Sequence, residues 1–270
     1  GDIESFPFID PPDPRVVRDA VRSLHELRAF DADQLTEMGR NMARLPLDPR
    51  LARMLISASN LSCLQEVLII VSALSIQDPR ERPLDKQQAA DQAHSEHRDE
   101  KSDFLSFVKL WNALENDRQD MTRSAFRRHL EKRFLSPTRV REWRALHRQL
   151  LLSVKSLGMR VQSKTVLDAD YASVHRALLT GSLSFIGIKD ERGLYQGPRN
   201  LKFRIFPGST MAKKTPKWLV AAEIVETQRT YARCVAAVEP RWIEEAAPHL
   251  LKRSYSQPYW DERRGEVIAL

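Results

Sequence analysis

Cysteine is scarce in this sequence, and Cys63 and Cys234 stand far apart, each within an apolar run. A disulfide framework or a cysteine zinc site needs several cysteines at short spacings, so both are excluded. We predict that the two thiols are buried as small apolar side chains. Long apolar runs are also missing. Val67–Leu74 falls short of the roughly 20 residues that cross a bilayer, and residues 1–14 lack the pattern of a secretion signal. We expect a soluble, cytoplasmic protein.

Glycine is scarce too, and the nine glycines include no phosphate-binding loop, no dinucleotide fingerprint and no nucleophile elbow. His94 and His97 lie one helical turn apart near several carboxylates, but they lack the register and the four spaced ligands of a zinc site. We therefore predict no metal, no cofactor and no catalytic residues in this chain. It does not have the sequence of a complete enzyme.

Positive charge is present and unevenly distributed. The chain of 270 residues carries a net charge of +7 and has a pI of about 9.5. Residues 123–148 hold nine Lys/Arg against two Asp/Glu, and residues 199–233 hold eight against two. Concentrated basic charge favours a surface that follows phosphates. Solvated faces of ordinary helices and strands are the alternative.

The first predicted domain covers residues 1–56. Its prolines, four of them within residues 7–14, predict an extended lead-in. Helical spacing of apolar residues follows over Val17–Leu27. Gly39 and Pro46 then favour a short extended hairpin over Leu35–Leu47, and Asp48-Pro49 is a good start for another helix. We predict a small winged-helix-like module.

Two further domains and a connector follow. Residues 57–166 carry broad apolar stripes at helical spacing and predict a helical bundle. Residues 167–250 begin with a helix near 171–179 and continue as short strand-like runs separated by Gly and Pro, which favours a small OB-fold barrel. Residues 251–270 show no clear element and are expected to connect to a missing C-terminal extension. The predicted fold class is multidomain α+β.

Four stretches in this order resemble the C-terminal accessory region of DEAH-box ATP-dependent RNA helicases, with the bacterial members closest. Phe6–Pro12 is similar to the link that leaves the second RecA-like domain of these enzymes. Leu35–Pro49 follows their winged-helix pattern L-T-x-x-G-x-x-x-x-x-x-P-L-x-P. Three short motifs are similar to the start of their helical ratchet domain: Ala73–Ser75, Arg82-Pro83 and Ser102–Leu105. Four more resemble their OB-fold strands: Ile205–Ser209, Pro216–Trp218, Glu223–Arg233 and Pro240–Trp242. The resemblance covers nearly the whole chain.

The resemblance implies a wall of a single-stranded RNA channel that works in RNA or ribonucleoprotein remodelling. ATP and Mg²⁺ would belong to the full-length helicase and its RecA-like domains, not to this fragment. Basic groups suit phosphates, and barrel aromatics suit bases of any sequence. We predict these RNA contacts: Arg204, Ser209, Lys213, Lys214, Lys217, Arg229, Tyr231 and Arg233 in the barrel, and Arg127, Arg128 and Arg139 in the ratchet.

The sequence departs from the family at two places that bear on this role. Phe206 stands where the family often has His, and Gln228-Arg229 where it often has Thr-Lys. The alternative function is a docking platform for a protein activator or the ribosome, with little RNA binding of its own. An RNA channel predicts salt-sensitive binding of short single strands, whereas a protein platform predicts weak RNA binding and an exposed apolar groove.

Overall fold

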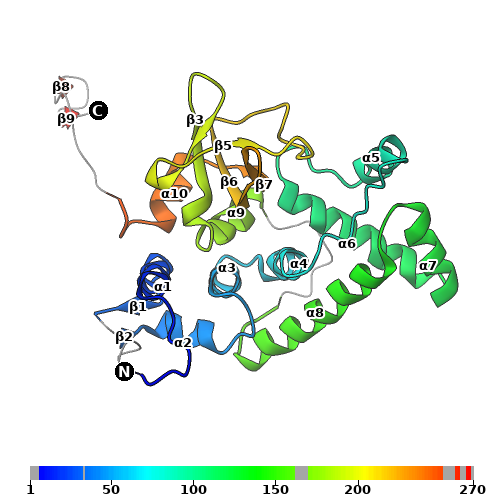
Figure 1. Cartoon of the computed structure of the whole chain (residues 1–270), viewed down its shortest axis with the longest axis horizontal. Coiled ribbons are helices and arrows are strands. Elements are labelled where there is room, and N and C mark those ends of the chain that lie inside the picture. The colour runs from blue at the N-terminus through cyan, green and yellow to red at the C-terminus, as the bar shows by residue number, and fades with distance from the viewer. Residues whose placement is uncertain (1–5, 33, 162–169, 252–258, 262–265, 269–270) are drawn as a thin grey trace.

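A computed structural model describes residues 6–32, 34–161, 170–251, 259–261 and 266–268. Figure 1 shows a small β-barrel on one side of the molecule, with helices α1 to α4 beneath it and helices α5 to α8 extending to the far end. The multidomain α+β prediction is confirmed. No helix within the described ranges combines the length and the apolar character that a bilayer crossing requires.

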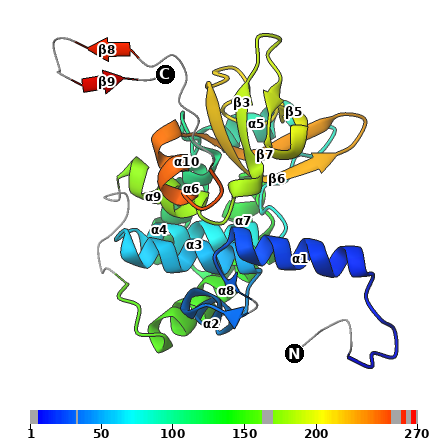
Figure 2. The ribbon, with the colours of Figure 1, turned by 90° about the vertical axis from the view of Figure 1, so that its left-hand side faces the viewer.

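The first module contains α1 (Pro14–Glu26), β1 (Phe30–Asp31), β2 (Gln34–Leu35), α2 (Glu37–Ala43) and α3 (Pro49–Asn60). Asp13 and Asp48 each cap a helix whose first residue is proline, because a carboxylate accepts the free backbone N–H there. The two short strands pair antiparallel. Figure 2 shows α1 projecting beyond α3, and none of its residues is buried.

The extended hairpin predicted over Leu35–Leu47 is wrong, because α2 occupies most of this segment. Thr36 caps the helix by accepting the backbone N–H of Gly39 at 3.0 Å. Gly39 does not break the helix. A Cβ there would lie 2.1 Å from the carbonyl oxygen of Ala29, so glycine is needed for close packing. Pro46 lies after the helix end.

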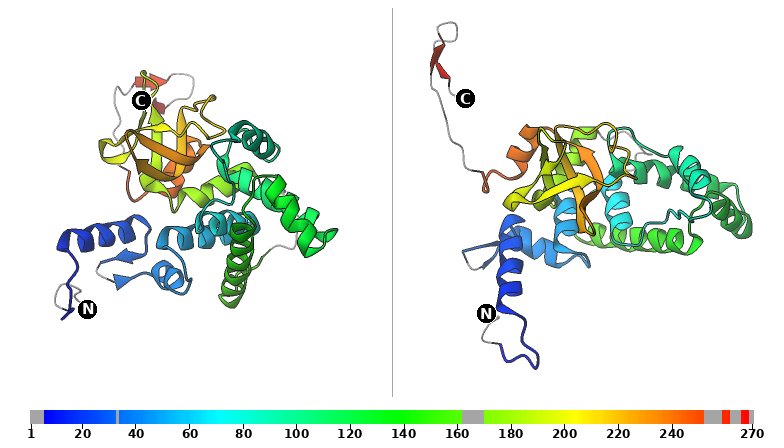
Figure 3. Two further views of the ribbon diagram at one scale, coloured as in Figure 1. Left: turned by 45° about the vertical axis from the view of Figure 1, so that its right-hand side comes forward. Right: turned by 45° about the horizontal axis from the view of Figure 1, so that its top comes forward.

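The second module is helical, as predicted. It contains α4 (Leu64–Leu74), α5 (Gln87–Ser95), α6 (Asp103–Gln119), α7 (Arg123–Lys132) and α8 (Pro137–Ser156). The apolar helix α4 is central and packs against α3, α6, α8 and α9. Figure 3 shows α7 at the edge of the molecule, away from α1 and α3.

Trp143 anchors α8 on α4. Its side chain is fully buried, and its indole N–H donates to the carbonyl oxygen of Ile69 at 3.1 Å and to the hydroxyl of Ser72 at 3.0 Å. Satisfying the indole N–H allows this large ring to contribute its apolar area to the core without a desolvation cost.

The third module begins with α9 (Tyr171–Leu179), which confirms the helix predicted there. The predicted boundary between residues 166 and 167 lies outside the described residues. The barrel is closed, with strand order β3-β4-β5-β7-β6. Its antiparallel neighbours and one parallel pair, β5 with β7, are consistent with the predicted OB-fold. The strands are β3 (Ile186–Lys189), β4 (Tyr195–Gln196), β5 (Lys202–Ile205), β6 (Trp218–Glu226) and β7 (Thr230–Ala237).

The chain then leaves the barrel through α10 (Pro240–Ala246). The prediction that residues 251–270 hold no element is wrong, because β8 (Tyr259–Asp261) and β9 (Glu266–Ile268) form a two-stranded antiparallel sheet. Each strand has only three residues, too few for an alternating pattern to be recognised in the sequence.

Candidate nucleic-acid interface

A groove of about 1320 Å³ runs between the barrel and the two helical modules. One wall is formed by the start of α3 and by the segment that follows α4. A second part of the wall comes from α5 and α8, and the barrel contributes residues 206–210 with the middle of β6 and β7. Every module therefore contributes to one continuous surface.

The charged side chains that line the groove nearly balance, with a slight positive excess. Among the described residues, six arginines and five carboxylates line it. Four of the arginines have a carboxylate of their own within 4 Å, and the N–O distances range from 2.7 to 3.9 Å. These pairs are Arg50–Asp48, Arg80–Asp78, Arg82–Asp91 and Arg233–Glu223.

The Arg80–Asp78 pair is the most enclosed of the four. The guanidinium donates to both carboxylate oxygens, at 3.0 and 2.7 Å, and its carbon lies 4.8 Å from the centre of the Phe107 ring. Burial opposes the charged form of both groups, but the hydrogen bonds between them outweigh it. The pKa of Asp78 is lowered and the pKa of Arg80 is raised. The pair therefore stays ionised.

Two groove arginines, Arg98 and Arg139, form no ion pair within the part of the chain that the structure describes. Arg98 is exposed, and Arg139 donates to the carbonyl oxygen of Asp78 at 3.1 Å. A guanidinium that forms no ion pair can accept a phosphate without displacing another anion. These two side chains are the groove's most available phosphate contacts.

Asp103 holds the barrel against the ratchet helices at the groove. It begins α6 and is 8% exposed. Its carboxylate accepts the hydroxyl of Ser209 at 2.5 Å, the backbone N–H and hydroxyl of Thr210 at 2.9 and 2.8 Å, and the backbone N–H of Val235 at 3.0 Å. Cys234, just before Val235, has a φ of +51° within β7. A single side chain thus fixes the barrel loop that borders the groove.

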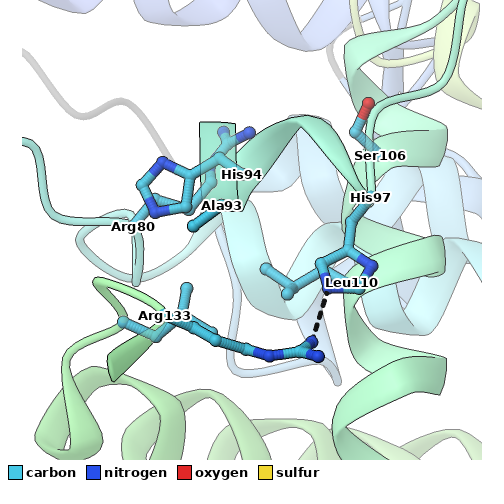
Figure 4. Close-up of a pocket in the computed structure, with 8 residues that line it drawn as sticks. Arg80, Ala93, His94, His97, Ser106, Leu110 and Arg133 are labelled. Atoms are coloured by element: carbon cyan, nitrogen blue, oxygen red, sulfur yellow. Dashed lines mark hydrogen bonds between the residues drawn. The ribbon is translucent and has the colours of Figure 1, made fainter. Parts of the chain in front are cut away.

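A second cavity lies behind the groove wall, between α5, α6 and the end of α7 (Figure 4). It has a volume of about 10 Å³, space for about one water molecule. Arg133 donates to His97 at 3.1 Å, and His94 donates to the carbonyl oxygen of Phe134 at 3.0 Å. Burial lowers the pKa of both histidines, as do the arginines nearby. The cavity is too small for an organic ligand.

Three of the predicted RNA contacts, Ser209, Arg139 and Arg233, line the groove. The Ser209 hydroxyl proton is committed to Asp103, so this side chain can offer a strand only its oxygen lone pairs. Their role as RNA contacts stays a prediction.

The other predicted contacts lie outside the groove. Lys213, Lys214 and Lys217 are exposed in the segment between residue 210 and β6, and the Lys214 ammonium lies 2.7 Å from Glu100. Arg229 is exposed in the turn between β6 and β7, and Arg204 and Tyr231 are neighbours on β5 and β7. Arg127 and Arg128 are exposed on α7.

Sequence reasoning missed Arg50, Arg80, Arg82 and Arg98, all of which line the groove. Arg80, Arg82 and Arg98 stand among acidic residues in the sequence, so no local excess of positive charge marks them, and Arg50 lies outside the two most basic segments. Only the tertiary fold brings them to one surface. Phe206 was noted only as a departure from the family, yet it too lines the groove.

Cys63 is buried as predicted, and burial raises the pKa of its thiol to about 12. Cys234 is half-buried and lines the groove. Over the described ranges, no group of three or more His, Cys, Asp or Glu side chains is arranged to hold a metal ion.

Comparison with family models identifies all three modules. Residues 20–47 match the helicase-associated domain (HA2), winged-helix; residues 48–135 match the helicase-associated domain (HA2), ratchet-like; and residues 174–250 match the oligonucleotide/oligosaccharide-binding (OB)-fold. The junction between the first two models falls after residue 47, whereas we placed it after residue 56. The chain therefore carries the domain set of helicase-associated regions.

Curated relatives agree. The chain is 49% identical over 277 residues to the ATP-dependent RNA helicase HrpA homolog of Haemophilus influenzae, and 49% identical over 276 residues to ATP-dependent RNA helicase HrpA of Escherichia coli. These matches cover 99% and 100% of the chain. The pre-mRNA-splicing factor ATP-dependent RNA helicase prp22 of Schizosaccharomyces pombe is 27% identical over 255 residues, 93% of the chain. Each match spans 21% of the relative's own length.

The chain belongs to the C-terminal accessory region of the DEAH-box helicases, and within that family it is close to HrpA. The family resemblance predicted from its motifs is confirmed.

Proposed function

We propose that this chain guides single-stranded RNA through the groove between its barrel and its helical modules. The observation that carries the proposal is the groove itself, because residues of all three modules line it together with six arginines. The groove extends across all three modules, so a flexible single strand that occupies it can contact each of them.

The charge pattern suits a strand that has to move. Four groove arginines already pair with carboxylates, so each attracts a phosphate less strongly than an unpaired arginine does. Arg98 and Arg139 offer the strongest hold. Each neutralised phosphate releases counterions and contributes affinity that falls with salt. A few strong contacts among many weak ones give binding that depends on the backbone and not on sequence.

The motor chemistry would come from elsewhere in a longer protein. Relatives of this chain are described as ATP-dependent RNA helicases. We therefore propose that the full-length protein hydrolyses ATP with Mg²⁺ in RecA-like domains, works in the cytoplasm, and uses this region to hold RNA or a ribonucleoprotein during remodelling. The RecA-like domains would be a protein partner of this region within the full-length protein.

A titration separates this proposal from a protein-docking platform. The full chain is mixed with labelled oligouridine of about 12 nucleotides, a length in the range that such grooves cover, and with an RNA duplex of equal length. We expect tighter binding of the single strand and a steep loss with salt. Equal binding of both RNAs, or no binding of either, contradicts the proposed groove function.

A further inference from the structure

The outer surface of the barrel next to the groove carries an unusual set of side chains. Along β5, Phe203 and Ile205 are buried and Arg204 points outward. The alternation continues past the end of the strand, so Phe206 follows Arg204 on the outside. Along β7, Ala232 is buried between Tyr231 and Arg233, which lie on the outer face.

These four outward residues are in contact in pairs. Arg204 and Tyr231 are register partners in the parallel pair of β5 and β7, and the backbone N–H of Phe206 donates to Ala232 at 2.9 Å. The Phe206 and Tyr231 rings meet edge to face, with centroids 6.0 Å apart and planes at 89°. The Arg233 guanidinium carbon lies 4.9 Å from the centre of the Phe206 ring. We call this set the aromatic–arginine face: Arg204, Phe206, Tyr231 and Arg233.

Phe206 does not belong to the core of the barrel. Its side chain is 38% exposed and contributes nothing to the barrel's interior cluster in the described structure. The backbone of Gly208 lies close to the ring, because a Cβ at that position would lie 2.9 Å from a ring carbon. This apolar ring is left partly in water at the edge of the groove, with a guanidinium over it.

The face continues the groove. Phe206 and Arg233 line it, whereas Arg204 and Tyr231 lie on the adjoining outer surface. Arg233 has one acidic neighbour, Glu223, at 3.9 Å, and both arginines of the face are exposed. The face therefore combines two cations with two aromatic rings along one path that leads out of the groove.

We infer that the aromatic–arginine face stacks unpaired nucleobases of an RNA strand that enters or leaves the groove, with its two arginines at the neighbouring phosphates. This inference rests on the proposed function. Every base has a π face, so stacking on Phe206 and Tyr231 adds affinity without reading sequence. The guanidinium of Arg233 extends the stacking surface and carries the charge that a phosphate seeks.

The test compares strands with and without bases. The full chain is titrated with labelled oligouridine of about 12 nucleotides and with a strand of the same length whose central nucleotides are abasic. The variants are Phe206→Leu and Phe206→Leu/Tyr231→Leu. Phe8→Leu is the matched control, because Phe8 is 42% exposed and lies in the lead-in before α1. Thermal unfolding of each variant checks that the barrel stays folded.

We expect wild type to prefer the base-bearing strand by about 10-fold, as stacking of one or two bases provides. Phe206→Leu should remove most of this preference and leave the affinity for the abasic strand within about 2-fold, and Phe8→Leu should behave as wild type. Equal losses on both strands, or no loss, overturn the stacking face while the groove proposal stands. Failure of wild type to bind either strand overturns both.

If a variant unfolds early, a 2-aminopurine reporter in the strand gives a second readout on wild type alone. Stacking on the face should quench its fluorescence on binding. Full fluorescence in the bound state contradicts the inference.

Discussion

The hydroxyl of Ser209 donates to the carboxylate of Asp103 at 2.5 Å, across the junction between the barrel and the ratchet helices. The same carboxylate accepts three more hydrogen bonds, two from Thr210 and one from Val235. These contacts fix residues 206–210, which form the barrel's side of the groove. The shape of the groove therefore depends on one buried acid.

Asp103→Asn tests this junction. The amide keeps the shape of the side chain but replaces one accepting oxygen with a donor that faces other donors. We expect a loss of about 2–3 kcal/mol in the free energy of unfolding, typical of a disrupted buried hydrogen-bond network. Urea unfolding measures it. Asp19→Asn on the exposed surface of α1 is the control and should change stability by less than about 0.5 kcal/mol. Equal effects of the two substitutions would mean that the junction does not depend on Asp103.

Glu26 makes a similar connection between α1 and the barrel. Its carboxylate accepts the Ser184 hydroxyl at 2.6 Å and pairs with Arg199 at 2.9 Å. We expect Glu26→Ala and Ser184→Ala each to cost about 1–2 kcal/mol. The double variant should cost less than the sum, with a coupling of about 1 kcal/mol measured by a double-mutant cycle. Strictly additive losses would show that the contact adds no stability.

Acid should destabilise the chain through its buried histidines. His175 lies between Ser102 and the Tyr171 carbonyl, each at 2.7 Å, and burial lowers its pKa to about 4. The folded state therefore binds this proton less readily than the unfolded state. Stability is complete above the unfolded pKa of about 6.5 and falls by up to about 1.4 kcal/mol per pH unit as pH drops toward 4.

His175→Gln should flatten this pH dependence, although it lowers stability at neutral pH. His147, whose pKa burial also lowers to about 4, would keep part of the slope. Tyr171→Phe is the control, because it removes a hydroxyl from the same cluster without changing a group that titrates between pH 4 and 7. Urea unfolding at several pH values gives the slopes. An unchanged slope in His175→Gln would contradict the assignment.

The exposed basic residues of the barrel that lie outside the groove give a separate prediction. Lys213→Glu/Lys214→Glu/Arg229→Glu should weaken binding of single-stranded RNA by several fold at low salt, since three phosphate contacts would be replaced by repulsion. Anisotropy titration measures the effect. Arg127→Glu/Arg128→Glu, with exposed positions on α7, tests the predicted ratchet contact in the same assay. If either variant binds RNA with the affinity of wild type, its substituted residues do not contact the RNA.

Local patterns predicted most elements correctly where periodicity was strong. The apolar stripes of α6 and α8 and the alternation of β5 are examples, because burial of one face dictates the spacing. Helix α2 was not predicted from the sequence, because a glycine such as Gly39 usually interrupts a helix. The reason for glycine at this position, contact with the Ala29 carbonyl, exists only in the folded chain.

The residues that line the groove were harder to predict from the sequence, for a related reason. Concentrated charge identified the basic segments, but it could not tell inward side chains from outward ones. Arg133 and Arg144 belong to the most basic segment, yet they pair with Asp117, Glu96 and Glu115 inside the ratchet. Arg82 and Arg98 line the groove from a segment that is nearly neutral. Which charged side chains reach one surface depends on the fold. The charge distribution did not reveal the order of the domains, which the family motifs indicated.

The most direct test of the RNA groove is the salt dependence of binding in a pair of charge-matched variants. Labelled oligouridine of about 12 nucleotides is titrated with wild type, with Arg98→Glu/Arg139→Glu in the groove, and with Arg15→Glu/Arg18→Glu on exposed α1. We predict that the groove variant loses at least about 10-fold in affinity at low salt, and that the slope of log affinity against log salt falls by about 1.4 from two lost phosphate contacts. The α1 variant should stay within about 2-fold of wild type. Equal losses in both variants, or none in the groove variant, would contradict the account.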